Sequence, residues 1–422
     1  MRIKYIRMYD YVIIGGGISG LYALQELHKQ NPKYRILLCD ERSYMGGRLL
    51  THANPQYEIG GARFHNNHKL LLSLIRKHKC TKIPLTKTSL FLEQTRENNI
   101  VPYYDVGETL ASLMSQIIKD SKKHSKQFLQ EYSLASYITH QYKDKTLTHK
   151  IKDIFGYYSE IEVMNAYDAL VSFEEDFLSK QFYILKEGFT ALCERMCAAY
   201  DSKVNIEVKK NTRIVRVEKQ NKNDCYVVHS EKNKYECAKI IFAIKAPQLR
   251  AFSLLKPIHP LLSCIHGAPL LRIYAKYPKQ KNKVWFDGFP KIITNNILRQ
   301  IIPIDRKSGL IMISYSDGKD IDPFLKNKNK LELRDKTEVQ NIIARELKNL
   351  FPSYTIPKPT YFNMHLWTLG CHHWKPGCDS SHIIKKVQTP LPGVYVVGEA
   401  FSHKQAWMEG ALESVECVKS LF

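Results

Sequence analysis

The chain has 422 residues, of which 44% are hydrophobic, and it carries a formal net charge of +22. This length favours two domains with a large core, and the ordinary hydrophobic content predicts a globular protein. No stretch approaches about 18 uninterrupted apolar residues, so we expect no transmembrane helix. The ten cysteines have irregular spacing, which is more typical of a reducing compartment than of a disulfide framework. We therefore expect a soluble, cytoplasmic protein.

The positive charge lies mainly in short lysine runs that alternate with Asn and Gln, such as residues 279–283 and 326–330. Runs of this kind are typical of solvated loops, and a lysine- and asparagine-rich proteome would explain them. The alternative is attraction to nucleic acid or another polyanion, which would be non-specific and sensitive to salt. The sequence shows no nucleic-acid module and no basic stretch interleaved with stacking aromatic residues.

The first elements of the chain predict a βαβ unit. Residues 11–14 and 36–39 form apolar runs typical of buried strands, and the segment that begins at Ile18 has apolar residues at helical spacing. Three glycines separate the first strand from the body of the helix, and an acidic residue follows the second strand. These residues are Gly15, Gly17, Gly20 and Asp40.

Each of these positions has a physical role in holding a dinucleotide. Gly15 allows a tight turn, Gly17 lets the backbone approach a pyrophosphate, and Gly20 lets the helix pack closely on the sheet. The helix N-terminus attracts the phosphate charge, and Asp40, 20 residues after Gly20, accepts a ribose hydroxyl. The alternative is an ordinary glycine turn between core elements, but the flanking strand and helix and the position of Asp40 favour a dinucleotide site.

The rest of the chain predicts further mixed structure. Residues 67–182 are expected to be largely helical, followed by strands at 204–208, 213–218, 225–229 and 239–244. Residues 256–377 indicate strands with one long helix, and the chain ends with a strand at 394–397 and a terminal helix. We therefore predict an α/β fold, α+β overall, in which a split Rossmann-like domain (1–66, 183–255 and 378–422) carries an inserted sheet-plus-helix domain (67–182 and 256–377) for the substrate.

Several stretches combine glycines with charged or aromatic residues. They are Asp40-Glu41-Arg42 with Met45-Gly46-Gly47-Arg48, residues 57–63, Lys186-Glu187-Gly188-Phe189, residues 243–247, and Gly398-Glu399 through residues 407–414. Together they resemble the flavin-dependent amine oxidase family, which includes monoamine, polyamine and L-amino acid oxidases. The resemblance implies an FAD cofactor that accepts a hydride equivalent from the carbon bearing an amine. It also implies an imine product, a small amine or amino acid as substrate, and oxygen as acceptor, giving hydrogen peroxide.

The pattern of glycines followed by Asp40 and the family resemblance together assign the cofactor-binding residues. Arg48 offers a cation for phosphate or flavin carbonyls, and the N-terminal dipole of the last helix would stabilise negative charge on the flavin, with the backbone at Met408 as donor. The alternative for this helix is plain C-terminal packing. The assigned residues are Gly15, Gly17, Ser19, Gly20, Asp40, Glu41, Arg42, Gly47, Arg48, Gly61, Ala62, Arg63, Gly398, Glu399, Trp407 and Met408.

By the same resemblance, Trp407 forms an aromatic wall of the amine cage, with a core tryptophan as the alternative. His372 stands where monoamine oxidases have the tyrosine of the other wall, and Cys371 matches the cysteine that tethers their flavin. We expect FAD to be non-covalent, with a covalent link through Cys371 as the alternative. Although Cys371, His372, His373 and Cys378 include metal-ligating types, their spacing matches no standard zinc pattern, so no metal is expected.

Two arginines complete the candidate catalytic set. Arg272 stands where the family usually has a lysine that holds a water near the flavin and assists reaction with oxygen, which puts the acceptor in question. The alternative for Arg272 is a surface arginine on an alternating strand. Arg63 matches an arginine that pairs with the substrate carboxylate in L-amino acid oxidases. The alternative for Arg63 is an ion pair within the FAD domain or a contact with flavin.

Three functions follow as hypotheses. The first is an FAD-dependent amine or L-amino acid oxidase, and the second is a related desaturase or dehydrogenase with another acceptor. The third is a basic, polyanion-associated protein that retains a flavin fold. The sequence indicates neither the substrate nor the oligomeric state.

Overall fold

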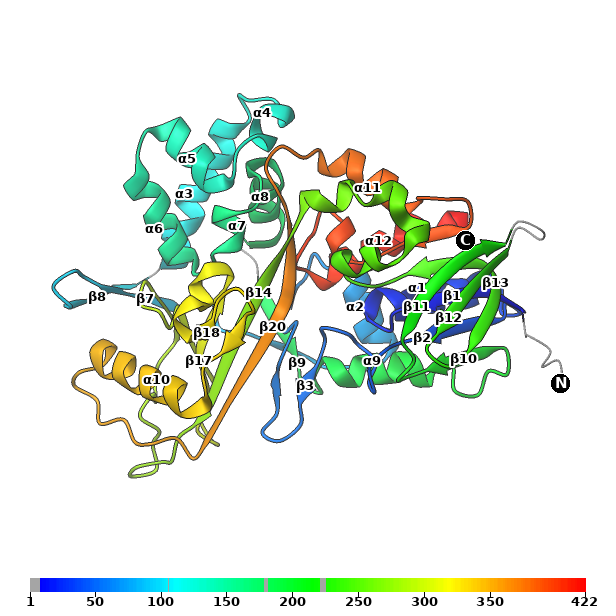
Figure 1. The fold of residues 1–422 in the computed structure, drawn as a ribbon. Coiled ribbons are helices and arrows are strands. Elements are labelled where there is room, and N and C mark those ends of the chain that lie inside the picture. The colour runs from blue at the N-terminus through cyan, green and yellow to red at the C-terminus, as the bar shows by residue number, and fades with distance from the viewer. Residues whose placement is uncertain (1–7, 105, 178–180, 221–224) are drawn as a thin grey trace. The chain divides into compact units, whose positions relative to one another are not determined.

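The computed structural model describes residues 8–104, 106–177, 181–220 and 225–422, which form two compact units (Figure 1). Unit 1 takes in the segments up to Pro84, Phe182–Ile265 and Cys378–Phe422, and unit 2 comprises Leu85–Gln181 and His266–Gly377. Among the described residues, no helix combines the length and apolar character needed to cross a membrane.

Unit 1 is built on a seven-stranded sheet in the order β10-β2-β1-β13-β12-β11, with β21 also paired to β13. Strands β10, β2, β1, β13 and β21 run parallel, whereas β12 pairs antiparallel with both β13 and β11. The sheet strands are β1 (Met8–Ile14), β2 (Ile36–Cys39), β10 (Ile206–Lys209), β11 (Ile214–Gln220), β12 (Cys225–Ser230), β13 (Lys234–Phe242) and β21 (Val394–Val396). This mixed α/β architecture confirms the predicted fold class.

The first βαβ unit forms where the apolar pattern predicts it. Helix α1 (Ile18–Gln30) joins β1 to β2, and its buried face packs with β1 and β2 in the core of unit 1. The other helices of unit 1 are α2 (Lys69–Lys77), α9 (Phe189–Ala198), α11 (Ser380–Gln388) and α12 (Met408–Glu416), with short helical turns at Ala246–Ala251 (η2), Ser253–Ile258, Leu261–Cys264, Glu399–Phe401 and Lys419–Leu421. Its small strands are β3 (Thr51–His52), β4 (Tyr57–Glu58), β5 (Phe64–His65), β6 (Lys82–Pro84) and β9 (Phe182–Leu185).

Unit 2 contains a second sheet, in the order β20-β14-β17-β16-β15-β7-β8. Its strands are β7 (Ser89–Gln94), β8 (Ile100–Tyr104), β14 (Ile265–Lys276), β15 (Lys291–Thr294), β16 (Gln300–Asp305), β17 (Leu310–Asp317) and β20 (Tyr361–Trp374), with a separate pair β18 (Leu325–Asn327) and β19 (Glu332–Leu333). Its helices are α3 (Val106–Ser121), α4 (Lys126–Gln130), α5 (Leu134–Tyr142), α6 (Lys145–Phe155), α7 (Ser159–Glu162), α8 (Ala166–Ser172), Phe173–Phe177, Gly318–Phe324 and α10 (Lys336–Leu350).

The expectation that residues 67–182 are largely helical holds for α2 but is wrong for residues 82–104. Strands β6, β7 and β8 lie there, and β7 pairs with β15, some 200 residues away in the chain. Phe91 and Leu92 of β7 are buried by that pairing. A long-range partner therefore decides the structure of this segment, in place of local periodicity.

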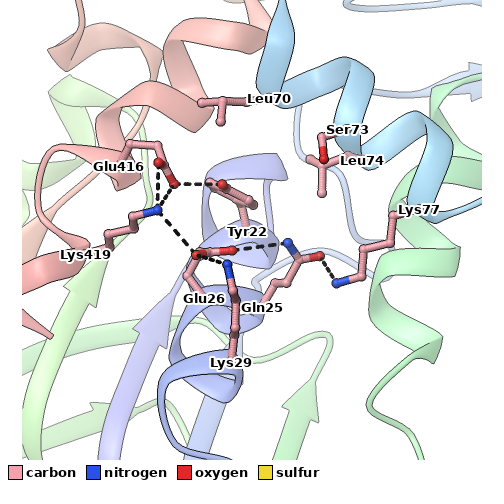
Figure 2. Close-up of a pocket in the computed structure, with 10 residues that line it drawn as sticks. All are labelled: Tyr22, Gln25, Glu26, Lys29, Leu70, Ser73, Leu74, Lys77, Glu416 and Lys419. Atoms are coloured by element: carbon pink, nitrogen blue, oxygen red, sulfur yellow. Dashed lines mark hydrogen bonds and ion pairs between the residues drawn. The ribbon is translucent and has the colours of Figure 1, made fainter.

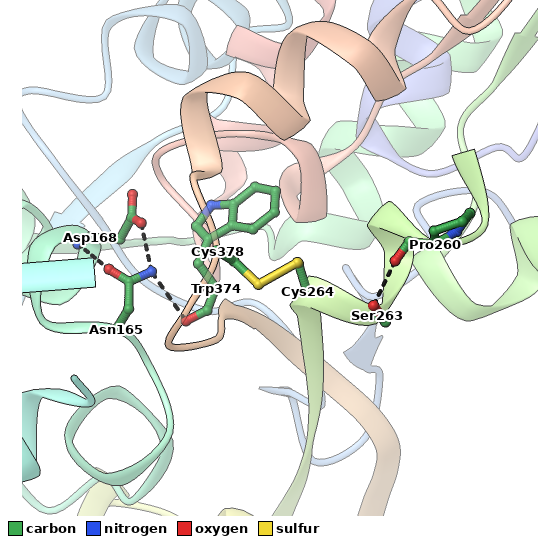
Figure 3. The surroundings of a disulfide bond; sticks show 7 residues. All are labelled: Asn165, Asp168, Pro260, Ser263, Cys264, Trp374 and Cys378. Atoms are coloured by element: carbon green, nitrogen blue, oxygen red, sulfur yellow. Dashed lines mark hydrogen bonds between the residues drawn. A yellow bond between two sulfur atoms is a disulfide. The ribbon is translucent and has the colours of Figure 1, made fainter. Parts of the chain in front are cut away.

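Cys264 and Cys378 form a disulfide, with their Cα atoms 5.8 Å apart (Figure 3). Cys264 comes directly before β14, and Cys378 follows β20, the strand paired with β14. The irregular cysteine spacing gave no indication of this pair, because the two residues are 114 positions apart. Since Cys378 is bonded to Cys264, it is not available as a metal ligand.

Candidate functional site

The glycine spacing is explained by close backbone contacts between β1, α1 and β13. Gly15 has φ of +108°, and a Cβ placed on it would lie 2.4 Å from the carbonyl oxygen of Ala243. A Cβ on Gly20 would lie 2.0 Å from the carbonyl oxygen of Gly15. A side chain at either position would therefore push the helix or the neighbouring strand away from the turn.

Gly17 differs from both, because its surroundings are open. It precedes α1 with an ordinary φ of −68°, and within the described ranges nothing lies within 4 Å of a Cβ placed on it. Ser19, in the first turn of α1, is buried beside it. The N-terminus of α1 is therefore approachable at Gly17, as the binding of a diphosphate requires.

The side chain of Asp40 stabilises the glycine loop between β1 and α1 through hydrogen bonds. Its carboxylate accepts hydrogen bonds from the backbone N–H of Gly16 and of Arg42, both at 2.7 Å. The side chain of Arg42 then donates to the carbonyl oxygen of Gly47 at 2.8 Å. These hydrogen bonds fix Asp40, Arg42 and the turn at Gly47 beside the glycine loop.

Arg48 and Glu399 tie this region to the C-terminal segment. The Arg48 guanidinium pairs with Glu399 at 2.5 Å, and the other oxygen of Glu399 accepts from the backbone N–H of Ala406 at 3.2 Å. Gly61 donates its N–H to the carbonyl oxygen of Arg48 and lies against the side chain of Met408. Gly398, with φ of +138°, has no atom within 4 Å of a Cβ position among the described residues.

Unit 1 therefore brings together the predicted cofactor-binding residues from three stretches of sequence. The open space beside Gly17, the N-terminus of α1 and two guanidinium groups form a cradle that suits the diphosphate of a dinucleotide. The residues placed beside this cradle are Gly15, Gly17, Ser19, Gly20, Asp40, Arg42, Gly47 and Arg48, and those of the C-terminal segment are Gly398, Glu399, Trp407 and Met408. Glu41 lies at the edge, 3.9 Å from Arg213.

A compact aromatic cluster forms around Trp407, which is buried. The Trp407 ring lies parallel to that of Phe182, with centroids 6.1 Å apart. The guanidinium carbon of Arg63 lies 4.8 Å from the Phe182 ring centroid and 5.7 Å from that of Trp407. His65 and His68, both buried, have ring centroids 3.8 Å apart at a tilt of 44°, and both make T-shaped contacts with Trp407. The sequence had pointed to Arg63 and Trp407 but not to Phe182 or the histidines, whose only signal was their aromatic character.

Unit 2 holds Arg272, Cys371 and His372. Arg272 on β14 is 6% exposed, so the alternative of a surface arginine is wrong. Its guanidinium carbon lies 4.6 Å from the ring centroid of Tyr315 on β17, and its Nη2 donates to the Tyr315 hydroxyl at 3.4 Å. Tyr315 is a partner that no sequence motif indicated.

His372 and His373 are both buried at the end of β20. On the paired strand β14, burial and the charges of His373, Lys375 and His372 lower the pKa of His266 to about 4. The surroundings of His266 therefore disfavour its charged form.

A cavity of about 350 Å³ lies between α1, α2 and the C-terminal segment of unit 1 (Figure 2). Two of its lysines already have partners: Lys419 donates to both oxygens of Glu416, and Lys77 donates to the side-chain amide oxygen of Gln25 at 2.7 Å. The lining residues differ from every predicted site residue. We therefore interpret the polar side chains that line this cavity as a surface network of ion pairs and hydrogen bonds, and not as a ligand site.

Comparison with known proteins places the chain in a family. The sequence profile of flavin containing amine oxidoreductases matches residues 18–415. A protein of Acanthamoeba polyphaga mimivirus designated R188 is 36% identical over 81 residues, and nicotine dehydrogenase of Pseudomonas putida is 44% identical over 59 residues. These alignments span 18% and 14% of this chain and only 16% and 12% of the two relatives.

The fold of the whole chain is similar to that of putrescine oxidase, whose structure bound to putrescine matches with a TM-score of 0.78 and 16% identity over 98% of both chains. At this identity the likeness establishes the fold alone, whereas the family profile covers nearly the whole sequence. The glycine cradle and the guanidinium groups of Arg42 and Arg48 suit a dinucleotide, and the family profile identifies it as a flavin dinucleotide. The chain belongs to the flavin-containing amine oxidoreductase family.

Proposed function

We propose that the protein oxidises the CH–NH2 group of a small amine that also carries a carboxylate, as an L-amino acid does. The observation that carries this proposal is the position of Arg63 over Phe182 and Trp407. A guanidinium stays charged at neutral pH, and its planar fork binds a carboxylate through two hydrogen bonds. A second cation, such as the far ammonium of a diamine, would be repelled from the same place.

In this proposal unit 1 binds FAD and carries Arg63 and Trp407, and the family resemblance keeps His372 and Arg272 as further candidate residues. When bound, FAD supplies the acceptor for the hydride equivalent that leaves the substrate carbon. The chain's own residues orient the amine and exclude water: the Trp407 face forms an apolar wall, and Arg63 fixes the carboxylate. The N-terminus of α12 stabilises negative charge beside Met408.

The identity of the electron acceptor is a separate part of the proposal. We propose oxygen, with hydrogen peroxide as product, from the family resemblance. The buried contact of Arg272 with Tyr315 favours a second candidate, a dehydrogenase with another acceptor, because Arg272 replaces the lysine expected beside the flavin. Nicotine dehydrogenase bears a name of that kind. Peroxide formed in step with substrate oxidation in air supports the oxidase, and substrate oxidation without it supports the dehydrogenase.

The state of the flavin link and the role of the charge are tested separately. We propose non-covalent FAD, which acid precipitation should release into the supernatant. Flavin retained in the pellet, and lost from it in Cys371→Ala, would support the covalent alternative. Binding to a polyanion remains a competing hypothesis for the +22 charge. Turnover that neither heparin nor salt alters would argue against a polyanion-dependent function.

The Arg63 proposal is tested with matched substrate pairs, each an L-amino acid and the amine that lacks only its carboxylate. Arg63→Ala should raise KM for the amino acid by about a hundredfold, the value of a charged bidentate contact of roughly 2.7 kcal/mol, and change KM for the amine little. Arg250→Ala removes an exposed arginine of unit 1 and serves as the control. Equal effects of Arg63→Ala on both substrates would contradict the carboxylate role.

A further inference from the structure

A lysine that is not among the assigned cofactor-binding residues lies beside the glycine turn. After β13 ends at Phe242, Ala243 donates its N–H to the carbonyl oxygen of Ile14 at 2.8 Å, and the Ala243 carbonyl lies against Gly15. Lys245 follows two residues later and precedes η2, where its backbone N–H donates to the side chain of Gln248 at 3.2 Å. The backbone of Lys245 is therefore fixed close to the dinucleotide turn.

The side chain of Lys245 is half-buried in a region of like charge. Burial, Arg48 and Arg42 together lower the pKa of Lys245 to about 8, against an opposing effect of Glu41. Glu41 also lies 3.9 Å from Arg213 and 3.4 Å from the Gln248 amide, while Arg48 shares Glu399 with the backbone of Ala406.

The segments that carry Lys245 and Arg42 both border the glycine loop, because the Ala243 carbonyl lies against Gly15 and Asp40 binds the N–H groups of Gly16 and Arg42. The charges of Arg42 and Arg48 act on Lys245 there. Holding like charges together in a partly buried place is unfavourable, and an anion with two charges placed among them removes that penalty. The cradle around Gly17 is the place for such an anion, because it is open and lies at the positive end of α1.

We propose that Lys245 is a third cationic contact for the diphosphate of FAD, and that it makes the retention of FAD weaken as the solution becomes alkaline. This inference rests on FAD binding and not on the identity of the amine substrate. If Lys245 proved to have no effect on FAD binding, the proposed reaction would be unaffected. If the proposed substrate proved wrong, the inference about Lys245 would be unaffected.

The sign of the pH dependence follows from linkage. The diphosphate favours the protonated lysine, so the affinity for FAD is complete below about pH 8 and falls as Lys245 loses its proton in the flavin-free protein. The charged groups that face Lys245 are Arg42, Arg48 and Glu41, and guanidinium and carboxylate groups do not change charge between about pH 7 and 9. A decline of affinity in this interval therefore reports on the lysine.

The test is the Kd of FAD, measured at several pH values by serial dilution of the holoprotein and the rise of free-flavin fluorescence. Between pH 7 and pH 9 the wild-type Kd should rise about tenfold, the limit for one proton lost a unit above its pKa. Lys245→Gln should bind FAD about tenfold more weakly at pH 7 and show a flat profile. Lys245→Arg should keep the wild-type Kd at pH 7 and also show a flat profile, because arginine does not titrate there.

Arg250→Gln, an exposed change of equal charge on the same η2 turn, should keep the wild-type profile. A second readout needs no release of flavin: the pH dependence of Lys245 acetylation by acetic anhydride, followed by mass spectrometry. Its midpoint should lie above about pH 9 in holoprotein. The proposal is overturned if Lys245→Gln matches the wild type in Kd and slope, if Lys245→Arg retains the slope, or if bound FAD leaves the acetylation midpoint near pH 8.

Discussion

Gly17→Ala separates the role of the glycine loop in folding from its role in binding FAD. Gly17 has an ordinary φ of −68°, and among the described residues nothing lies within 4 Å of the added methyl group. Replacing glycine by alanine at a compatible position stabilises a protein by about 0.4–1 kcal/mol through the unfolded state. Because alanine is a poorer residue than glycine before a helix, that gain is offset by a similar amount. The free energy of unfolding of the flavin-free protein should therefore change by less than about 1 kcal/mol.

FAD binding should respond quite differently. The methyl group would occupy the space through which the backbone approaches the diphosphate, and forcing one extra carbon into a packed contact costs about 1–3 kcal/mol. Converted at about 1.4 kcal/mol per tenfold, the Kd for FAD should rise roughly five- to 150-fold. The purified variant should also contain much less flavin than the wild type, by the ratio of flavin to protein absorbance.

Gly20→Ala is the matched comparison. Its Cβ would lie 2.0 Å from the backbone oxygen of Gly15, which cannot rotate away, so the helix must move. This variant should lose about 3 kcal/mol or more of stability, together with its flavin. Urea unfolding of the flavin-free proteins measures the stability term. If Gly17→Ala bound FAD with the wild-type Kd, or destabilised the fold as Gly20→Ala does, the placement of the diphosphate at this loop would be refuted.

Three further predictions concern other parts of the chain. Cys264→Ser opens a loop of 114 residues and should lower the free energy of unfolding by up to about 4.8 kcal/mol. Cys378→Ser should have the same effect, and the double variant should be no less stable than either single one. Unchanged urea midpoints would contradict the disulfide. His266 has a pKa lowered to about 4 by burial and its neighbours, so it contributes stability above about pH 6.5 that is lost as the pH falls towards 4. His266→Gln should remove at most about 3 kcal/mol of this acid sensitivity, measured as urea midpoints at pH 4.5 and 7 against the wild type. Arg272→Lys should speed reoxidation of the substrate-reduced protein by oxygen about tenfold in stopped flow, since it restores the compact ammonium group; a rate no faster than wild type would count against the oxygen-related role of this position.

The part of the site that the sequence predicted is the part encoded locally. Gly15, Gly17 and Gly20 occupy one turn, and their roles follow from contacts with residues that any βαβ unit places beside them. Asp40 follows β2 by one residue, so strand register alone brings it to the loop. Short-range geometry of this kind is readable from spacing.

The missed features depend on contacts between distant segments. Phe182 meets Arg63 and Trp407 only because β9 pairs with β5, and Tyr315 meets Arg272 through the pairing of β17 with β14. Lys245 is set apart from other lysines by its burial beside two arginines, which no motif describes. Packing partners across a sheet leave no periodic signal in either segment, so such contacts required the structure.

The central claim is tested most directly by an anaerobic titration. The flavin absorbance of the purified protein is followed while pooled L-amino acids, and separately pooled amines without a carboxylate, are added in the absence of oxygen. The account predicts bleaching by the amino acid pool and little by the amines, independent of the final acceptor. Bleaching by the amines alone would contradict the role of Arg63, and no bleaching by either pool would contradict amine oxidation itself.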